Sequence, residues 1–160
     1  MARAVVPALL ALACLTGCRS KPEPRPLPPM VPDLAKVEKD VDHVHERLAE
    51  RYPGKKPRLL LSPVNNRTGR VVDMPALNAA LERSFRDRDA VELVLLPPEG
   101  TPPPPVDVKL RAALIDTPVD DEPGTTIFRV DMVLADGDNL LIAQINGSEW
   151  KEKLPPPPEE

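Results

Sequence analysis

Prolines divide this chain more sharply than any other feature. Twenty-three of its 160 residues are proline, and most of them lie in three tracts, at residues 19–32, 97–105 and 155–158. A proline ring fixes φ and removes the backbone donor, so these tracts cannot form helix interiors or central strands. The remaining segments hold enough apolar residues, 41% over the whole chain, for one small core. The pattern predicts a single domain over residues 33–154, preceded by a tether over residues 18–32 and followed by a stiff acidic tail over residues 155–160.

The proline content of the tether predicts its conformation and its maximum length. Residues 19–32 contain six prolines in 14 positions. Such a segment samples the extended polyproline II conformation, and at about 3.1 Å per residue it spans at most about 43 Å. We interpret it as a spacer that holds the domain away from an attachment point. The alternative is a ligand for an aromatic-lined groove, a role that proline-rich segments also take.

The first eighteen residues have the order of an export signal. Residues 1–3 carry a positive charge, and the apolar run of residues 4–14 is too short for a transmembrane helix of about 20 residues. The sequence LTGC at residues 15–18 follows and resembles the lipobox of bacterial lipoproteins. The resemblance implies a signal peptide of residues 1–17, cleavage before Cys18 and acylation of Cys18 by fatty acids such as palmitate. The alternative is an ordinary signal peptide followed by a chance cysteine.

Lipidation would leave the mature chain without a free thiol. Cys14 lies in the signal, so Cys18 would be the only remaining cysteine, and an intramolecular disulfide is impossible. Several acyl chains would anchor the protein firmly in a membrane. Arg19 stands where an aspartate often retains lipoproteins in the inner membrane. The resemblance therefore favours a lipid anchor on the periplasmic face of the outer membrane.

Two segments have the periodicity of amphipathic helices. The first begins after Asp33, a good N-cap, and ends before Pro53; the second begins after Asp73 and runs to about Arg88. Their apolar residues recur at intervals of three and four, which places them on one stripe of each helix. The stripes are Leu34, Val37, Val41, Val44, Leu48 and Tyr52 in the first helix, and Met74, Leu77, Leu81 and Phe85 in the second.

Five segments have the pattern of strands. Residues 58–64 and 91–96 are short apolar runs, as in strands buried on both faces. Residues 106–112 and 128–134 alternate apolar and polar side chains, and a last strand starts after the turn at residues 136–139. The expected fold class is α+β: a small mixed sheet of about five strands, with a parallel βαβ unit, then an antiparallel hairpin, and two helices packed on one face. We expect Leu60 and Leu81 in one core.

Residues that could support catalysis or metal binding are few. His43 and His45 are the only imidazoles, and two residues apart on a helix they point about 200° from each other, so they cannot share a metal. We expect both on the surface. The acidic run of residues 120–122 lacks the spacing of a calcium loop, so a solvated loop is expected.

Other classes of function are disfavoured on similar grounds. The chain has no nucleophile elbow and no glycine-rich phosphate loop, so we expect no catalytic residues, no metal, no cofactor and no enzymatic activity. The net charge of −4 argues against a nucleic acid as the partner.

One stretch carries a family resemblance. The sequence LLLSPVNNRTG, residues 59–69, resembles the strand and loop that open the globular domain of the LpoB-type penicillin-binding-protein activators. The matching positions are Ser62, Val64, Asn65, Asn66, Arg67 and Thr68, with Pro63 inserted. Residues 129–150 look like the family's closing hairpin, and the lipobox, tether and first helix agree in order. Residues 97–105 replace a longer helical segment of the family.

The resemblance implies an outer-membrane lipoprotein that binds and activates or positions a periplasmic peptidoglycan synthase. Its domain would be similar to the amino-terminal domain of TolB and to the CsgG-like fold. The candidate partner-binding residues are Asn65, Asn66, Arg67 and Thr68; the alternative is that they only stabilise a strand-to-helix turn. A second function also fits the anchor, that of a structural or secretion-assembly lipoprotein of the outer membrane.

Overall fold

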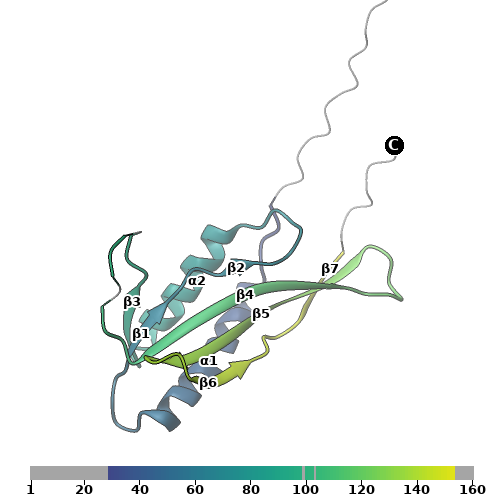
Figure 1. The fold of residues 1–160 in the computed structure, drawn as a ribbon. Helices are drawn as coiled ribbons and strands as arrows, with labels where there is room; N and C mark the ends of the chain where they lie inside the picture. Colours follow the sequence, from purple (N-terminus) through teal and green to yellow (C-terminus); the bar gives the residue numbers. More distant parts are fainter. Residues whose placement is uncertain (1–28, 99, 103, 154–160) are drawn as a thin grey trace, which may run out of the picture.

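The computed structural model describes residues 29–98, 100–102 and 104–153. The expected signal peptide, Cys18 and the acidic tail therefore lie outside the described residues. The elements are α1 (Leu34–Arg51), β1 (Arg58–Leu61), β2 (Asn65–Asn66), α2 (Met74–Asp87), β3 (Glu92–Leu95), β4 (Val108–Pro118), β5 (Thr125–Asp136), β6 (Leu141–Ile145) and β7 (Trp150–Lys153). Both helices lie behind the long hairpin of β4 and β5 (Figure 1). The α+β fold class is confirmed.

The two helices begin where their capping residues predict. The Asp33 carboxylate accepts a hydrogen bond from the Lys36 N–H, and the Asp73 carboxylate accepts one from the Ala76 N–H at 3.0 Å. These bonds satisfy backbone donors that have no partner inside the helix. At its other end, α1 stops when the Tyr52 N–H bonds the Leu48 carbonyl, just before Pro53. None of the helices in the described residues is long and apolar enough to cross a membrane.

The sheet joins a parallel part to an antiparallel part. Its main path runs β3-β1-β4-β5-β6, with β1 parallel to both β3 and β4, and β4 antiparallel to β5. The βαβ unit and the closing β5–β6 hairpin are thus confirmed. The β4–β5 pairing extends over eleven residue pairs. Its far end, with the turn that contains the acidic residues 120–122, projects beyond the helices (Figure 1).

Two predicted strands are each divided in two, which raises the sheet from about five strands to seven. The run at residues 58–64 becomes β1 and β2, which lie one after the other along β4. Pro63 lies at the break, where it has no N–H to donate to a ladder. The last run becomes β6 and β7, which lie one after the other along β5. The main path therefore has the predicted number of five strands, and β2 and β7 are short additional strands paired with β4 and β5.

The core lies between the sheet and the helices. It contains Val37, Val41, Val44, Leu48, Leu77, Leu81 and Phe85 from the helices, and Leu59, Leu61, Leu110, Leu114, Val130, Met132 and Leu134 from the strands. Leu60 is buried but lies outside this cluster, because its side chain is on the opposite face of the sheet, with its strand neighbours Val94 and Lys109. The expectation that Leu60 shares a core with Leu81 is therefore wrong. Leu59 and Leu61 share that core instead, because side chains alternate between the two faces of a strand.

The folded part reaches further toward the N-terminus than the first helix. Met30 forms a parallel bridge with Val72: the Met30 N–H donates to the Val71 carbonyl at 3.0 Å, and the Asp73 N–H donates to the Met30 carbonyl at 2.9 Å. Pro32 is buried and Met30 packs against the core. The folded domain therefore begins at about Met30, which lies beside the segment that follows Gly69.

Candidate interaction site

The loop at residues 65–69 is held by its own side chains. The Asn66 side-chain oxygen accepts hydrogen bonds from the Thr68 N–H at 3.0 Å and from the Thr68 hydroxyl at 2.7 Å. The Asn66 amide nitrogen donates to the Arg70 carbonyl at 3.1 Å, and the Thr68 hydroxyl accepts from the Arg70 N–H at 3.3 Å. An asparagine side chain that bonds the backbone two residues later is a common way to fix a turn. Asn66 and Thr68 thus shape the loop from within.

The other two candidate residues of the loop face outward. Asn65 and Arg67 are both exposed, and β2 joins them to the sheet: Asn65 pairs with Ala113, and the Arg67 N–H donates to the Leu114 carbonyl at 2.9 Å. The Arg67 guanidinium forms no ion pair with any described residue. The four predicted residues therefore divide into two that hold the loop and two that present polar groups to solvent.

Asn65 and Arg67 line a groove on the face of the sheet that the helices do not cover. Its volume is about 560 Å³. The remaining lining residues are Ser62, Pro63, Arg111, Ala112, Ala113, Ile115, Asp131, Val133 and Gln144. The β4–β5 register explains this set, because Arg111 lies opposite Val133 and Ala113 lies opposite Asp131. The loop and the centre of the sheet thus form one continuous surface.

The groove carries unbalanced positive charge. Asp131 is its one acidic lining residue, and the Arg129 guanidinium pairs with that carboxylate at 3.0 Å. Arg111 is exposed and, like Arg67, has no acidic partner among the described residues. Two free guanidinium groups therefore border a floor of aliphatic side chains. Such an arrangement can bind carboxylates by forked hydrogen bonds.

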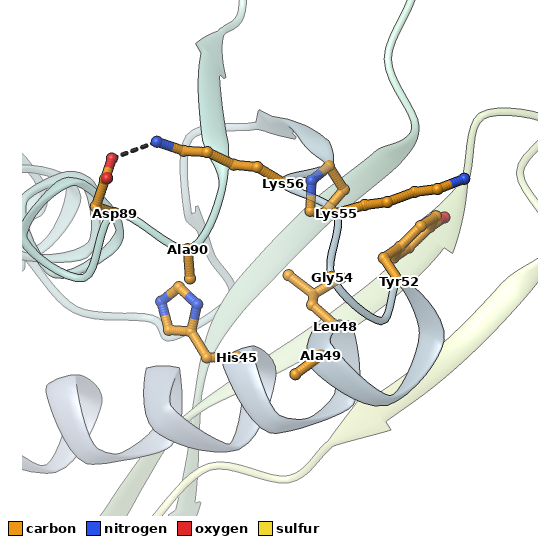
Figure 2. Close-up of a pocket in the computed structure, with 10 residues that line it drawn as sticks. His45, Leu48, Ala49, Tyr52, Gly54, Lys55, Lys56, Asp89 and Ala90 are labelled. Carbon is orange, nitrogen blue, oxygen red and sulfur yellow. Dashed lines mark hydrogen bonds and ion pairs between the residues drawn. The ribbon is translucent and has the colours of Figure 1, made fainter.

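A second hollow lies where the C-terminal half of α1 meets residues 54–57 and 89–90. It has a volume of about 380 Å³ and is lined by His45 and Tyr52, among others. Figure 2 shows the imidazole of His45 directed toward Ala90, and Lys56 paired with Asp89. Among the lining residues, Lys55 forms no ion pair with a described residue, and no group of side chains is placed to hold a metal ion.

His45 differs from the prediction that both histidines lie on the surface. Its ring packs against Phe85 of α2 with centroids 5.1 Å apart, and neither ring nitrogen finds a hydrogen-bond partner. Burial, followed by the nearby Arg88 charge, lowers the pKa of His45 below 6.5, and Asp42 opposes this shift. His43 is exposed, as predicted, and its Nδ1 lies 3.2 Å from a Glu46 carboxylate oxygen.

The acidic run lies at the tip of the β4–β5 hairpin. Asp120, Asp121 and Glu122 are all exposed, and Lys151 pairs with Glu122 at 2.9 Å. This ion pair, chiefly through a hydrogen bond from Lys151, lowers the pKa of Glu122. Over residues 29–98, 100–102 and 104–153, no group of three or more His, Cys, Asp or Glu residues is placed to hold a metal ion. The run of residues 120–122 is a solvated turn.

Two residues that matter to the site escaped the sequence analysis. Asn78 of α2 accepts a hydrogen bond from the Val64 N–H at 2.8 Å, which supports the backbone between β1 and β2. Arg111 joins the groove from the middle of β4. The alternation of residues 106–112 was visible in the sequence and placed Arg111 on the solvated face. No sequence pattern indicated that this face lies beside the loop.

No protein-family model matches the chain, and no curated protein matches it. Among solved structures it is similar to the LpoB C-terminal domain from Escherichia coli, with 14% identity, a TM-score of 0.49, and coverage of 71% of this chain and 95% of that one. The same domain from Salmonella enterica gives 14% identity and a TM-score of 0.49, covering 76% of this chain and 99% of that one.

The NMR structure of E. coli LpoB is a third neighbour, with 13% identity, a TM-score of 0.48, and coverage of 94% of this chain and 84% of that one. These neighbours are the proteins to which the sequence resemblance pointed.

Proposed function

We propose that the chain is an outer-membrane lipoprotein that faces the periplasm, where its domain binds and activates or positions a peptidoglycan synthase of the penicillin-binding-protein type. The domain would act as a binding module and carry out no chemistry of its own. The observation that carries the proposal is the loop at residues 65–69. Its sequence resembles that of known activators, and its Asn66 and Thr68 side chains hold Asn65 and Arg67 in an exposed position.

The expected lipid anchor supports the same function. Acylation at Cys18 would place the tether at the membrane, and the tether would enter the domain at Met30, which is bonded to the segment after Gly69. A domain confined near a membrane meets an envelope partner at a raised effective concentration, so a modest affinity suffices. The end of the tether at Met30 lies beside Val72, three residues after the loop.

Arg67→Ala in the soluble domain tests the binding role directly. We expect the affinity for the synthase to fall by about 1 kcal/mol or more, because arginine is enriched among the residues that dominate interface energies. The midpoint of thermal unfolding should stay unchanged, since the Arg67 side chain bonds no described residue. Affinity would be measured by surface plasmon resonance against each purified synthase of the source organism, and unfolding by circular dichroism.

Two control variants separate binding from folding. Arg83→Ala removes another exposed arginine, on α2, and should leave both affinity and stability unchanged. Asn66→Ala should lower stability, because it removes the side-chain bonds that hold the loop. Loss of both affinity and stability in Arg67→Ala would make Arg67 structural. If the unaltered domain neither binds nor stimulates any such synthase, the activator function fails, and the assembly-lipoprotein function replaces it.

The anchor has its own test. Mass spectrometry of the protein extracted from membranes should find a mature chain that starts at Cys18 and carries two or three acyl groups. Cys18→Ser should yield a soluble or uncleaved form. A mature chain that starts at another residue without lipid would contradict the lipoprotein assignment and leave the loop unaffected as a candidate site.

A further inference from the structure

We propose that the groove on the uncovered face of the sheet binds an acidic, extended segment of a partner protein. The segment would place two carboxylates on Arg67 and Arg111 and an aliphatic side chain between them on the floor of the groove. The inference deepens the proposed function, on which it rests for the identity of the partner. It concerns a surface that includes β4 and β5 as well as the loop.

Charge balance is the first observation behind this proposal. The whole chain is acidic, with a net charge of −4, yet the groove contains two exposed arginines without a described acidic partner. Its single carboxylate, on Asp131, is already paired with Arg129 at 3.0 Å and accepts a further hydrogen bond from the Gly147 N–H at 3.2 Å. The unmet charge of the groove is therefore positive, and it complements an acidic segment.

The spacing of the two arginines is the second observation. Arg111 lies four residues before Ile115 on β4, and Arg67 lies beside Ile115 because Asn65 pairs with Ala113. Given a rise of about 3.3 Å per residue and about 4.8 Å between strands, the two arginine backbones lie about 14 Å apart. An extended segment covers that distance in four residues. Carboxylates at positions 1 and 5 would thus lie on the same face of the segment and meet the two guanidinium groups.

The aliphatic floor between the two arginines indicates which type of residue the middle of the bound segment should carry. Ala113 and Ile115 are half-buried, and Val133 is 36% exposed, although no helix of the described chain covers them. Covering these side chains removes apolar surface from water and favours an aliphatic residue at position 3. A lipid or glycan surface would not supply this alternation of charge and aliphatic side chain, whereas a strand-like protein segment does.

The test uses the mature chain of residues 18–160 with Cys18→Ser, labelled with ¹⁵N, and the probe peptide Glu-Thr-Val-Thr-Glu with blocked ends. We expect saturable shifts of the amide signals of Ala113, Ile115 and Val133. The matched peptide Gln-Thr-Val-Thr-Gln should give no saturable shifts. Arg67→Gln and Arg111→Gln should each weaken peptide binding by about fivefold or more, as hot-spot arginines do. Arg83→Gln is the control and should bind as the unaltered chain does.

Several outcomes would overturn the proposal. These are shifts confined to another surface, equal binding of the neutral peptide, or undiminished binding by both arginine variants. The acidic tail of the chain is the rival occupant of the groove. If a chain that ends at residue 153 binds the peptide more tightly than the full chain, the tail occupies the groove, and the partner segment does not.

Failure of this inference can be told apart from failure of the proposed function. If a synthase binds the chain and Arg111→Gln does not weaken that binding, the groove proposal is wrong and the activator function stands. If the acidic peptide binds in the groove but no synthase binds the chain, the groove is a real site and its partner belongs to another class.

Discussion

His45 shows how one side chain couples this fold to pH. Its unpaired ring lies between α1 and α2 beside Phe85, with Arg88 and Asp42 as the nearby charges and the Lys56–Asp89 pair along the same hollow. The folded pKa is below 6.5, so between that lower value and 6.5 the unfolded chain binds more protons. The contribution of the neutral His45 ring to stability is therefore fully present above about pH 6.5 and is lost as the pH decreases through this window.

We expect the free energy of unfolding, measured in urea, to decrease as the pH is lowered from about 7.5 to about 5.5. In His45→Gln this decrease should be smaller, because the variant has no ring to protonate at that position. His43→Gln is the matched control, because His43 is exposed on the same helix. NMR titration should show the His45 ring changing charge below pH 6.5. A His45 ring that changes charge at or above pH 6.5 would contradict its burial against Phe85.

Asp40 is a second residue whose role is structural. Its side chain is 2% exposed, and the carboxylate accepts hydrogen bonds from the Ser148 N–H at 2.7 Å and the Ser148 hydroxyl at 2.6 Å. Asp40→Ala should lower the free energy of unfolding by about 2–3 kcal/mol, as loss of hydrogen bonds to a charged group does. Glu46→Ala, an exposed change on the same helix, should cost less than about 0.5 kcal/mol. Equal effects of the two changes in urea denaturation would show that the contact with Ser148 contributes little.

Among the elements, the junction between β6 and β7 depends on one glycine. A Cβ on Gly147 would lie 2.2 Å from the Val130 carbonyl oxygen, a backbone atom that cannot move without disturbing β5. Gly147→Ala should therefore destabilise the domain by about 1–3 kcal/mol, the usual cost of overpacking. Gly69→Ala is the control, because nothing lies within 4 Å of the added atom. Thermal unfolding would measure both, and an equal midpoint for both variants would contradict the close approach.

For the whole molecule, the extent of the folded unit can be tested at its N-terminal boundary. A chain that begins at Pro29 should unfold at the same temperature as the mature chain, since it keeps the Met30 bridge to Val72. A chain that begins at Asp33 loses two backbone hydrogen bonds and the packing of Met30 and Pro32. It should be less stable by about 1–2 kcal/mol, at about 1 kcal/mol net for each bond. If the two truncated chains had the same midpoint, the bridge would contribute nothing to stability.

The sequence by itself determined the helices, the strands and the candidate loop. Capping residues, periodicity and proline act over a few neighbouring residues. The helix starts at Asp33 and Asp73 and the helix end before Pro53 could therefore be predicted without tertiary information. The residues of the loop were found because their identities, rather than their positions in space, carry the resemblance. The α+β order followed from the succession of these local patterns.

Only the tertiary structure decided which surfaces those elements form together. Nothing local indicates that Arg111 shares a groove with Arg67, because strand register arises from pairings between residues far apart in sequence. The same reason explains His45, whose burial depends on the position of Phe85 in another helix, and the break between β6 and β7 at Gly147, which lies against the Val130 backbone of β5. Local sequence specifies the elements, and packing between distant segments specifies the surface that a partner would meet.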